Sequence, residues 1–202
     1  GQGKEGIVFV HGLGSRNFYY LKYYPENLVK HGYTIIMPVL PYHFERMPKD
    51  EKIDFLSGTA VDIENRFYQS VADILACVDY LENRGMEKIH IIGFSFGGMI
   101  GTIAKALDNR LDKGIFIVSG GNFLYITWKS VATKVLRVRY EDEDSCSIER
   151  CHRLHENFDD VVKDFTKLEE LKNLPSCFRY DPSLFAKMIN PENILMINAA
   201  FD

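Results

Sequence analysis

The chain has 202 residues, of which 46% are hydrophobic and 26% are charged. This is the composition of one ordinary folded domain, and it excludes a disordered chain, a collagen-like repeat and a coiled coil. A formal net charge of −4 gives no excess of positive charge that would indicate binding to nucleic acid. The sequence does not open with the charged segment and apolar run that are typical of a signal peptide. The most apolar window, 89–107, contains His90, Ser95 and Lys105, so no membrane span is predicted.

The first part of the chain, 1–120, alternates expected strands with expected helices. Continuous runs of β-branched and aromatic residues predict strands buried on both faces, and apolar residues at steps of three and four predict helices that cover a sheet. Gly32 and Gly85 stand where a left-handed residue would end a helix. The expected strands are 7–10, 33–37, 89–92 and 114–118, and the expected helices are 18–30, 67–81 and 97–107. This alternation predicts an α/β fold with a mainly parallel central sheet and helices on both faces.

The second part of the chain departs from this alternation. Apolar residues from 154 to 171 keep helical spacing, so residues 121–190 are expected to form a helical cap or lid inserted into the core. An apolar run predicts a fifth strand at 194–197, and residues 191–202 are expected to return to the core. Residues 42–59 mix charge, proline and glycine, which predicts a loop on the surface.

Ser95 lies in a G-x-S-x-G string, Gly93-Phe94-Ser95-Phe96-Gly97, directly after an expected strand and directly before an expected helix. The string alone occurs by chance in about one chain in fifteen of this length, so its placement is the informative feature. On such a sharp turn the serine hydroxyl projects above the sheet, and the flanking glycines avoid a clash with neighbouring backbone. The pattern predicts that Ser95 is a nucleophile, with the amino end of the following helix favouring an anionic intermediate.

A second string, His11-Gly12-Leu13-Gly14, follows the strand at 7–10 and would face the same edge of the sheet. Such a loop supplies one backbone amide to an oxyanion hole, and the residue after the nucleophile supplies the other, which predicts the amides of Leu13 and Phe96 as donors. The alternative is an ordinary turn whose histidine bonds to backbone groups. The residues expected to line a substrate site here are His11, Gly12, Phe94 and His43.

Three segments resemble the α/β-hydrolase superfamily of the serine-esterase type: I-V-F-V-H-G-L-G-S at 7–15, I-I-G-F-S-F-G-G at 91–98, and N-I-L-M-I-N-A-A-F-D at 193–202. The resemblance spans nearly the whole chain except the expected cap. It implies that Asp202, after a late strand, is the acid of a catalytic triad that orients a histidine and stabilises its imidazolium. The alternative is that Asp202 is a turn residue or a helix cap.

The histidine of the triad is where the sequence departs from the resemblance. The family order is serine, acid, histidine, and all six histidines of this sequence precede Asp202. His43, just past the second expected strand, is the nearest candidate for a substitute base. We expect the 202 residues to be part of a longer enzyme, clipped at both ends, whose remainder supplies the base, a last strand and a closing helix.

Cysteine and histidine residues of the expected cap give no metal site. Cys146 and Cys151 have spacing that fits no tetrahedral zinc pair, although His152 and His155 lie nearby. Four cysteines are too few for a disulfide scaffold, which favours a reducing compartment, with the cytoplasm preferred. A disulfide between Cys151 and Cys177 would require a secreted protein. Most of the aromatic residues at 18–24, with Phe123, Tyr125 and Trp128, are expected to pack in the core or the cap, and the alternative is that a few of them line an apolar acyl pocket.

Taken together, the motifs predict a serine hydrolase that cleaves a carboxylic ester or a related small acyl compound through an acyl-enzyme on Ser95, without a cofactor. A peptidase or thioesterase of the same fold is a second possibility, because the cap rather than the triad sets the leaving group. A third is a non-catalytic domain of this fold that binds a ligand, which the absent base favours.

Overall fold

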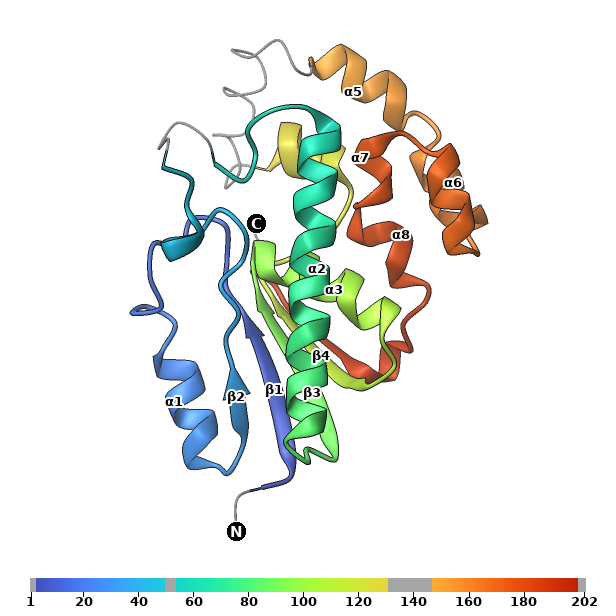
Figure 1. The fold of residues 1–202 in the computed structure, drawn as a ribbon. Helices are drawn as coiled ribbons and strands as arrows, with labels where there is room; N and C mark the ends of the chain where they lie inside the picture. Colours follow the sequence, from blue (N-terminus) through green and yellow to red (C-terminus); the bar gives the residue numbers. More distant parts are fainter. Residues whose placement is uncertain (1–2, 50–53, 131–146, 200–202) are drawn as a thin grey trace.

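The computed structural model describes residues 3–49, 54–130 and 147–199, and they form an α/β fold around a parallel sheet (Figure 1). Within these residues the sheet has five strands in the order β2-β1-β3-β4-β5. The strands are β1 (Glu5–Val10), β2 (Thr34–Ile36), β3 (Lys88–Phe94), β4 (Leu111–Ile117) and β5 (Ile194–Ile197). Every neighbouring pair runs parallel, which confirms the predicted sheet. The carboxyl ends of all five strands therefore meet at one edge.

The helices agree with the predicted ones in part, because two of the three predicted helices begin several residues away from the predicted start. They are α1 (Tyr23–Lys30), α2 (Ala60–Asn83), α3 (Phe96–Leu107), α5 (Ile148–His155), α6 (Phe158–Asp164), α7 (Ser176–Arg179) and α8 (Pro182–Ala186). Helix α2 starts earlier than predicted because Thr59 and Asp62 form a capping box, in which each side chain accepts a hydrogen bond from the backbone N–H of the other. Gly85 follows α2 with φ +81°, which confirms the predicted left-handed residue.

Apolar side chains of alternating strand residues fill two cores, one on each face of the sheet. Val8 and Ile91 belong to the larger core, which α2 and α3 cover. Phe9 and Ile92 belong to the smaller core, where Leu28 of α1 packs. Strands β1 and β3 are thus buried on both faces, which is why their sequences are continuous apolar runs. Helices on both faces of the sheet, as predicted, make this a three-layer fold.

The edge strand β5 is less covered than the central strands. Leu195 and Ile197 are 53% and 46% exposed, although Ile194 packs against the larger core. The carboxyl end of β5 is fixed to β4, because the N–H of Val118 donates to the carbonyl of Ile197 at 2.7 Å. The chain that follows β5 therefore starts at the same edge of the sheet as the chain that follows β3.

Two predictions about the amino-terminal part of the chain are wrong. The aromatic run at 18–24 does not pack inside, because Tyr19 and Tyr20 are 68% and 84% exposed, and the helix expected from residue 18 begins at Tyr23. Helix α1 buries a narrow face through Pro25 and Leu28, so its tyrosines turn to solvent. Proline is tolerated there because it lies in the first turn.

The segment 42–59 is not simply a surface loop. Its described residues include a short 3₁₀ helix, Phe44–Arg46, and two of its aromatic side chains, His43 and Phe55, are 5% and 1% exposed. The Phe55 ring contacts the Phe67 ring of α2 and the Phe96 ring of α3, with centroids 5.6 and 4.7 Å apart. This loop therefore forms part of the wall above the carboxyl edge of the sheet.

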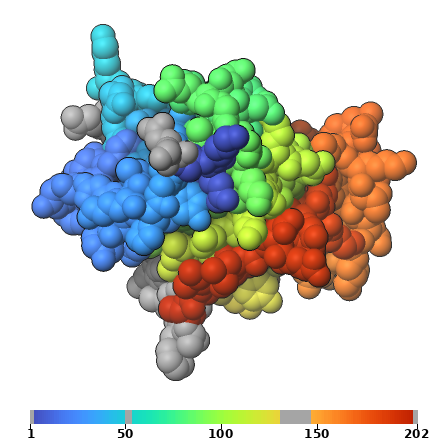
Figure 2. Space-filling view, turned by 90° about the horizontal axis from the view of Figure 1, so that it is seen from below, coloured from blue at the N-terminus to red at the C-terminus, as the bar shows by residue number. Residues whose placement is uncertain are grey.

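Short helices make up most of the described part of the predicted cap. The helical spacing from 154 to 171 is divided among α5, α6 and a 3₁₀ helix, Leu168–Asn173. Asn157, with φ −110° and ψ 19°, separates α5 from α6, and the extended backbone of Phe165 and Lys167 separates α6 from the 3₁₀ helix. A single π turn, Tyr125–Lys129, follows β4. Figure 2 shows the orange residues of this region on the flank of the molecule opposite to the blue residues of α1. None of the helices in the described ranges is both long and apolar enough to cross a membrane.

Candidate active site at the carboxyl edge of the sheet

Ser95 occupies a strained turn between β3 and α3. Its φ of +53° and ψ of −119° are unusual for a residue with a side chain. Such a strained backbone persists only where the surrounding structure holds it in place, and strained residues of this kind cluster at active sites. The Ser95 N–H donates to the carbonyl of Ile117 in β4 at 2.8 Å, which fixes the turn to the neighbouring strand. Ser95 is exposed while Phe96 and Gly97, which follow it, are buried. The turn thus presents a hydroxyl to solvent at the amino end of α3.

The two glycines of the motif are required by close backbone contacts. A Cβ atom on Gly93 would lie 2.5 Å from the carbonyl oxygen of Gly97. A Cβ on Gly97 would lie 2.4 Å from the carbonyl oxygen of Val10 and 2.5 Å from that of His11. Real Cβ atoms do not approach backbone this closely, so both positions need glycine for α3 to start directly against the ends of β1 and β3.

The loop at 11–14 passes directly beside Ser95. A Cβ placed on Gly12 would lie 3.4 Å from the Ser95 Cβ and 4.0 Å from its Oγ. The backbone N–H groups of Leu13 and Phe96 donate to no other residue within the described part of the chain. Two backbone donors therefore lie on the loop and on the helix start that flank the serine.

His11 supports this loop from inside the protein. It is fully buried, its Nδ1 lies 2.9 Å from the carbonyl oxygen of Gly12, and its Nε2 lies 3.1 Å from the backbone N–H of Leu40. Because Nε2 accepts from an N–H, the proton must be on Nδ1, which donates to Gly12. Burial lowers the pKa of His11 to about 4. His11 is therefore neutral near pH 7, and both of its nitrogens are occupied.

His43 is held beside His11 by backbone groups. Its Nδ1 lies 2.8 Å from the carbonyl oxygen of Pro41, it also bonds to the backbone of Leu13, and its ring centroid is 4.7 Å from that of His11. Burial lowers the pKa of His43, against the opposing effect of these backbone bonds. No hydrogen bond joins His43 to Ser95 in the described ranges. Its contacts brace the loop that carries Leu13.

Lowering the pH should destabilise the protein through His11. Its pKa rises from about 4 in the folded state to an ordinary value near 6.5 on unfolding, so the unfolded state binds more protons between these values. The free energy of unfolding should therefore fall as the pH falls through this window, by up to about 3 kcal/mol for this group.

The variant His11→Gln cannot titrate, so its stability should depend less on pH than that of the native protein. Urea unfolding at about pH 7 and about pH 4.5 measures this difference. His31→Gln, at an exposed histidine, is the matched control and should keep the native pH dependence. Equal pH dependence in His11→Gln and the native protein would contradict a neutral buried His11.

The residues after β5 lead toward the same edge. Asn198 Oδ1 accepts from the backbone N–H of Ser119 at 3.0 Å, and its Nδ2 donates to the Ser119 carbonyl at 3.2 Å, so this side chain ties the ends of β4 and β5 together. Asp202, the predicted acid, lies outside the described residues, as does Cys146. No group of three or more His, Cys, Asp or Glu side chains in the described ranges is arranged to hold a metal ion.

Asp181 is a buried carboxylate that the sequence did not single out. It accepts hydrogen bonds from the backbone N–H groups of Asn122, Phe123 and Ser183, at 2.8, 2.8 and 2.9 Å. Burial raises the pKa of Asp181, while these three bonds act in the opposite direction. Asp181 thus joins the chain after β4 to the start of α8. The Asp-Pro pair at 181–182 is the sequence signal for a helix start, but it does not reveal the contact with 122–123.

The fold and the strained serine define the class of protein. A parallel sheet with helices on both faces, and a serine on the turn from β3 to α3, are the architecture of an α/β-hydrolase. The family model described as phospholipase/carboxylesterase matches residues 2–177, and the chain belongs to this family.

Solved structures show the same fold at low sequence identity. An α/β-hydrolase from Penicillium sp. sh18, GrgF, has a TM-score of 0.52 and 15% identity over 96% of this chain and 71% of its own. A lipase-esterase related protein from Clostridium acetobutylicum ATCC 824 has a TM-score of 0.50 and 15% identity over 98% of this chain and 86% of its own.

Several other similar structures are longer than this chain. A lipolytic enzyme from the metagenome-derived pair LipS and LipT is 22% identical over 65% of this chain, with a TM-score of 0.46. This chain covers 46% of that protein, and 48% of a ferulic-acid-bound Est1E from Butyrivibrio proteoclasticus, so it spans about half their length. No curated protein sequence matches the chain.

Proposed function

We propose that this protein is a serine hydrolase that cleaves a carboxylic ester or a related small acyl compound through an acyl-enzyme on Ser95. The observation that carries the proposal is the backbone of Ser95, with φ of +53° at an exposed position at the amino end of α3. A protein keeps such a strained side-chain residue where its position is needed, and here the strain lifts a hydroxyl out of the sheet edge.

In the proposed reaction the Ser95 Oγ attacks the carbonyl carbon of the ester, and the hydroxyl proton passes to a general base. The carbonyl oxygen becomes an oxyanion that accepts hydrogen bonds from the N–H groups of Leu13 and Phe96. The base then gives the proton to the leaving alcohol as the C–O bond breaks, and the acyl group stays on Ser95. Water attacks this acyl-enzyme, releases the acid and restores the serine.

Four features support the assignment of these groups. The loop at 11–14 lies beside Ser95, its amides have no competing acceptor in the described residues, and His11 and His43 hold its backbone in place. The start of α3 adds the partial positive charge of its free amide groups. Together they favour an anionic intermediate over a neutral ester.

The general base is the part of the mechanism that the described residues do not supply. His11 has both nitrogens occupied, and His43 is bonded to the backbone. We propose that Asp202 orients the histidine that acts as base, as the family order of residues implies. Without such a base Ser95 would be a weak nucleophile. The absence of a paired histidine is also the observation that favours the alternative, a non-catalytic binding domain.

A panel of substrates with one acyl group and three leaving groups separates the candidate functions. We expect the protein, as its natural gene encodes it, to hydrolyse a phenyl ester of a short acid faster than the matched thioester, and the matched anilide slowest. Faster thioester or anilide cleavage would reassign the protein as a thioesterase or a peptidase of this fold. Hydrolysis of none of the three would support the binding domain instead.

A further inference from the structure

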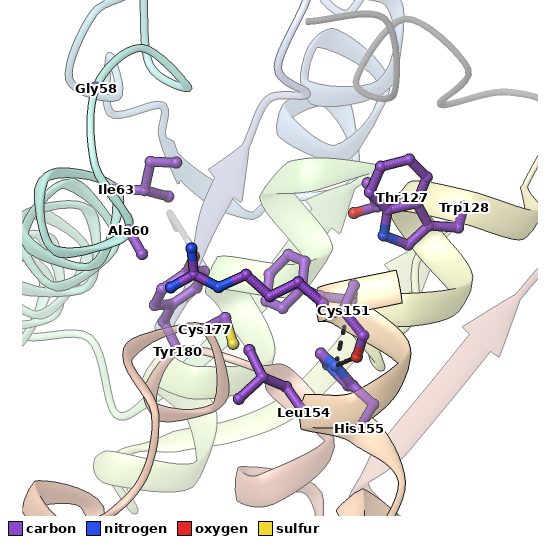
Figure 3. A pocket seen from close by; sticks show the side chains of 12 residues that line it. Gly58, Ala60, Ile63, Thr127, Trp128, Cys151, Leu154, His155, Cys177 and Tyr180 are labelled. Carbon is purple, nitrogen blue, oxygen red and sulfur yellow. Dashed lines mark hydrogen bonds between the residues drawn. The ribbon is translucent and has the colours of Figure 1, made fainter. Parts of the chain in front are cut away.

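A cavity of about 120 Å³ lies away from Ser95, between the start of α2 and the predicted cap (Figure 3). Apolar side chains supply much of its wall, including Ile63 of α2, Phe123 after β4 and Leu154 of α5. Its volume is close to the roughly 150 Å³ of a cavity that holds one benzene ring. A group of this size, and not a long acyl chain, is what the cavity can accept.

Two polar nitrogen atoms at this cavity have no hydrogen-bond partner among the described residues. They are Nε1 of Trp128 and Nε2 of His155, and their side chains belong to residues only 5% and 7% exposed. Both residues line the cavity. Buried polar groups are nearly always paired, so these two nitrogens are the atoms of the cavity lining that a bound polar group could satisfy.

The two nitrogens differ in hydrogen-bonding character. The indole N–H of Trp128 can only donate. His155 Nδ1 lies 2.9 Å from the carbonyl oxygen of Cys151, so Nδ1 carries the proton and Nε2 has the free lone pair. Burial lowers the pKa of His155, which keeps its ring neutral near pH 7. The cavity therefore offers one buried donor and one buried acceptor.

Aromatic rings separate this cavity from the serine. Tyr180 lines the cavity and stacks on Phe67 with ring centroids 4.5 Å apart, and Phe67 in turn lies 5.2 Å from Phe96, the residue after Ser95. Ser95 itself is not part of the cavity wall. The cavity is thus separate from the proposed nucleophile, although one layer of rings connects the two.

We propose that this cavity binds a neutral, ring-sized group that carries a hydroxyl. A hydroxyl oxygen accepts from Trp128 Nε1 while its hydrogen is donated to His155 Nε2, and the ring packs against the apolar walls. Arg150, an exposed residue that also lines the cavity, could pair with a carboxylate, but a carboxylate has no hydrogen to donate and would face the lone pair of His155. This assignment concerns binding and does not depend on the reactivity of Ser95.

Phenol and toluene are matched probes for this site, because they have one ring each and differ in the hydroxyl. Trp128 is the only tryptophan of the sequence, so a spectrum of ¹⁵N-labelled protein contains a single indole N–H signal. We expect phenol to shift this signal saturably and to bind about tenfold more tightly than toluene, because its hydroxyl forms two buried hydrogen bonds in exchange for hydrogen bonds to water. Benzoate should bind more weakly than phenol.

Two variants remove one nitrogen each and keep most of the packing. His155→Asn retains a side-chain amide near the position of Nδ1, for the bond to Cys151, and removes the acceptor at Nε2. Trp128→Phe removes the N–H donor, and calorimetry replaces the indole signal as the readout for it. We expect each variant to lose several-fold in phenol affinity and to keep its affinity for toluene, which also shows that the cavity is intact.

Equal affinity for phenol and toluene would overturn the assignment of a hydroxyl, as would tighter binding of benzoate. An indole signal that phenol does not shift saturably would mean that water alone occupies the cavity. The hydroxyl group can belong to the substrate or to a separate small molecule, and inhibition of ester hydrolysis by phenol distinguishes them. Competitive inhibition assigns it to the substrate, and non-competitive inhibition to a separate ligand.

Discussion

Replacing Ser95 with alanine should lower kcat/KM for ester hydrolysis by at least about 10³-fold, because the reaction then has no atom that can form the acyl-enzyme. The loss should appear in kcat, since the loop at 11–14 and the start of α3 remain to bind substrate. The fold should be unaffected, because Ser95 is exposed and its side chain supports no hydrogen bond within the described residues. Initial rates and urea unfolding of the two proteins measure both effects.

Ser119→Ala is the matched control for this variant. Ser119 lies after β4 at the same edge of the sheet, and the bonds to Asn198 use its backbone rather than its hydroxyl. We expect Ser119→Ala to keep the native rate to within about twofold. Loss of activity in Ser119→Ala alone, or an unchanged rate in Ser95→Ala, would remove Ser95 from the mechanism.

Replacing Gly97 with alanine should lower the free energy of unfolding by at least about 3 kcal/mol. Helix propensity alone predicts the opposite, a gain of up to about 1 kcal/mol, because Gly97 lies in α3. The close contacts of the new Cβ outweigh this gain, so the free energy of unfolding falls. The new Cβ would lie 2.4 Å from the Val10 carbonyl oxygen and 2.5 Å from that of His11, and backbone in the centre of the sheet cannot move away.

The same substitution should also reduce the reactivity of Ser95, because relief of the clash must shift α3 away from the loop at 11–14. Gly120→Ala is the control, since a Cβ there meets no atom within 4 Å. Urea unfolding of both variants tests the prediction. A Gly97→Ala protein as stable as Gly120→Ala would show that the close packing of α3 on β1 is wrong.

The sheet and the serine turn could be predicted from sequence because their signals are local. A buried parallel strand is a continuous apolar run, and the turn at 93–97 carries its own glycines, which the contacts of Gly93 and Gly97 explain. The sequence also contains a signal for the start of α2, the capping pair Thr59 and Asp62, although the apolar spacing indicates a later start.

Features that depend on distant contacts could not be predicted in this way. The burial of Phe55 depends on rings from α2 and α3, and the role of Asp181 depends on the amides of 122–123. The exposed tyrosines near α1 are residues that the sequence wrongly predicts to be buried. An aromatic run is typical of a core, and only the position of α1 at the edge of the sheet shows that these side chains face solvent. Composition and spacing carry no information about which distant segments meet.

The central claim is that Ser95 is an activated nucleophile, and covalent labelling by a fluorophosphonate tests it most directly. The protein, as its natural gene encodes it, is weighed intact before and after treatment, and the modified peptide is mapped. The proposed mechanism predicts one adduct, located on Ser95, and none in Ser95→Ala. An unlabelled protein, or an adduct on another residue, would contradict it and leave a ligand-binding domain as the better account of this fold.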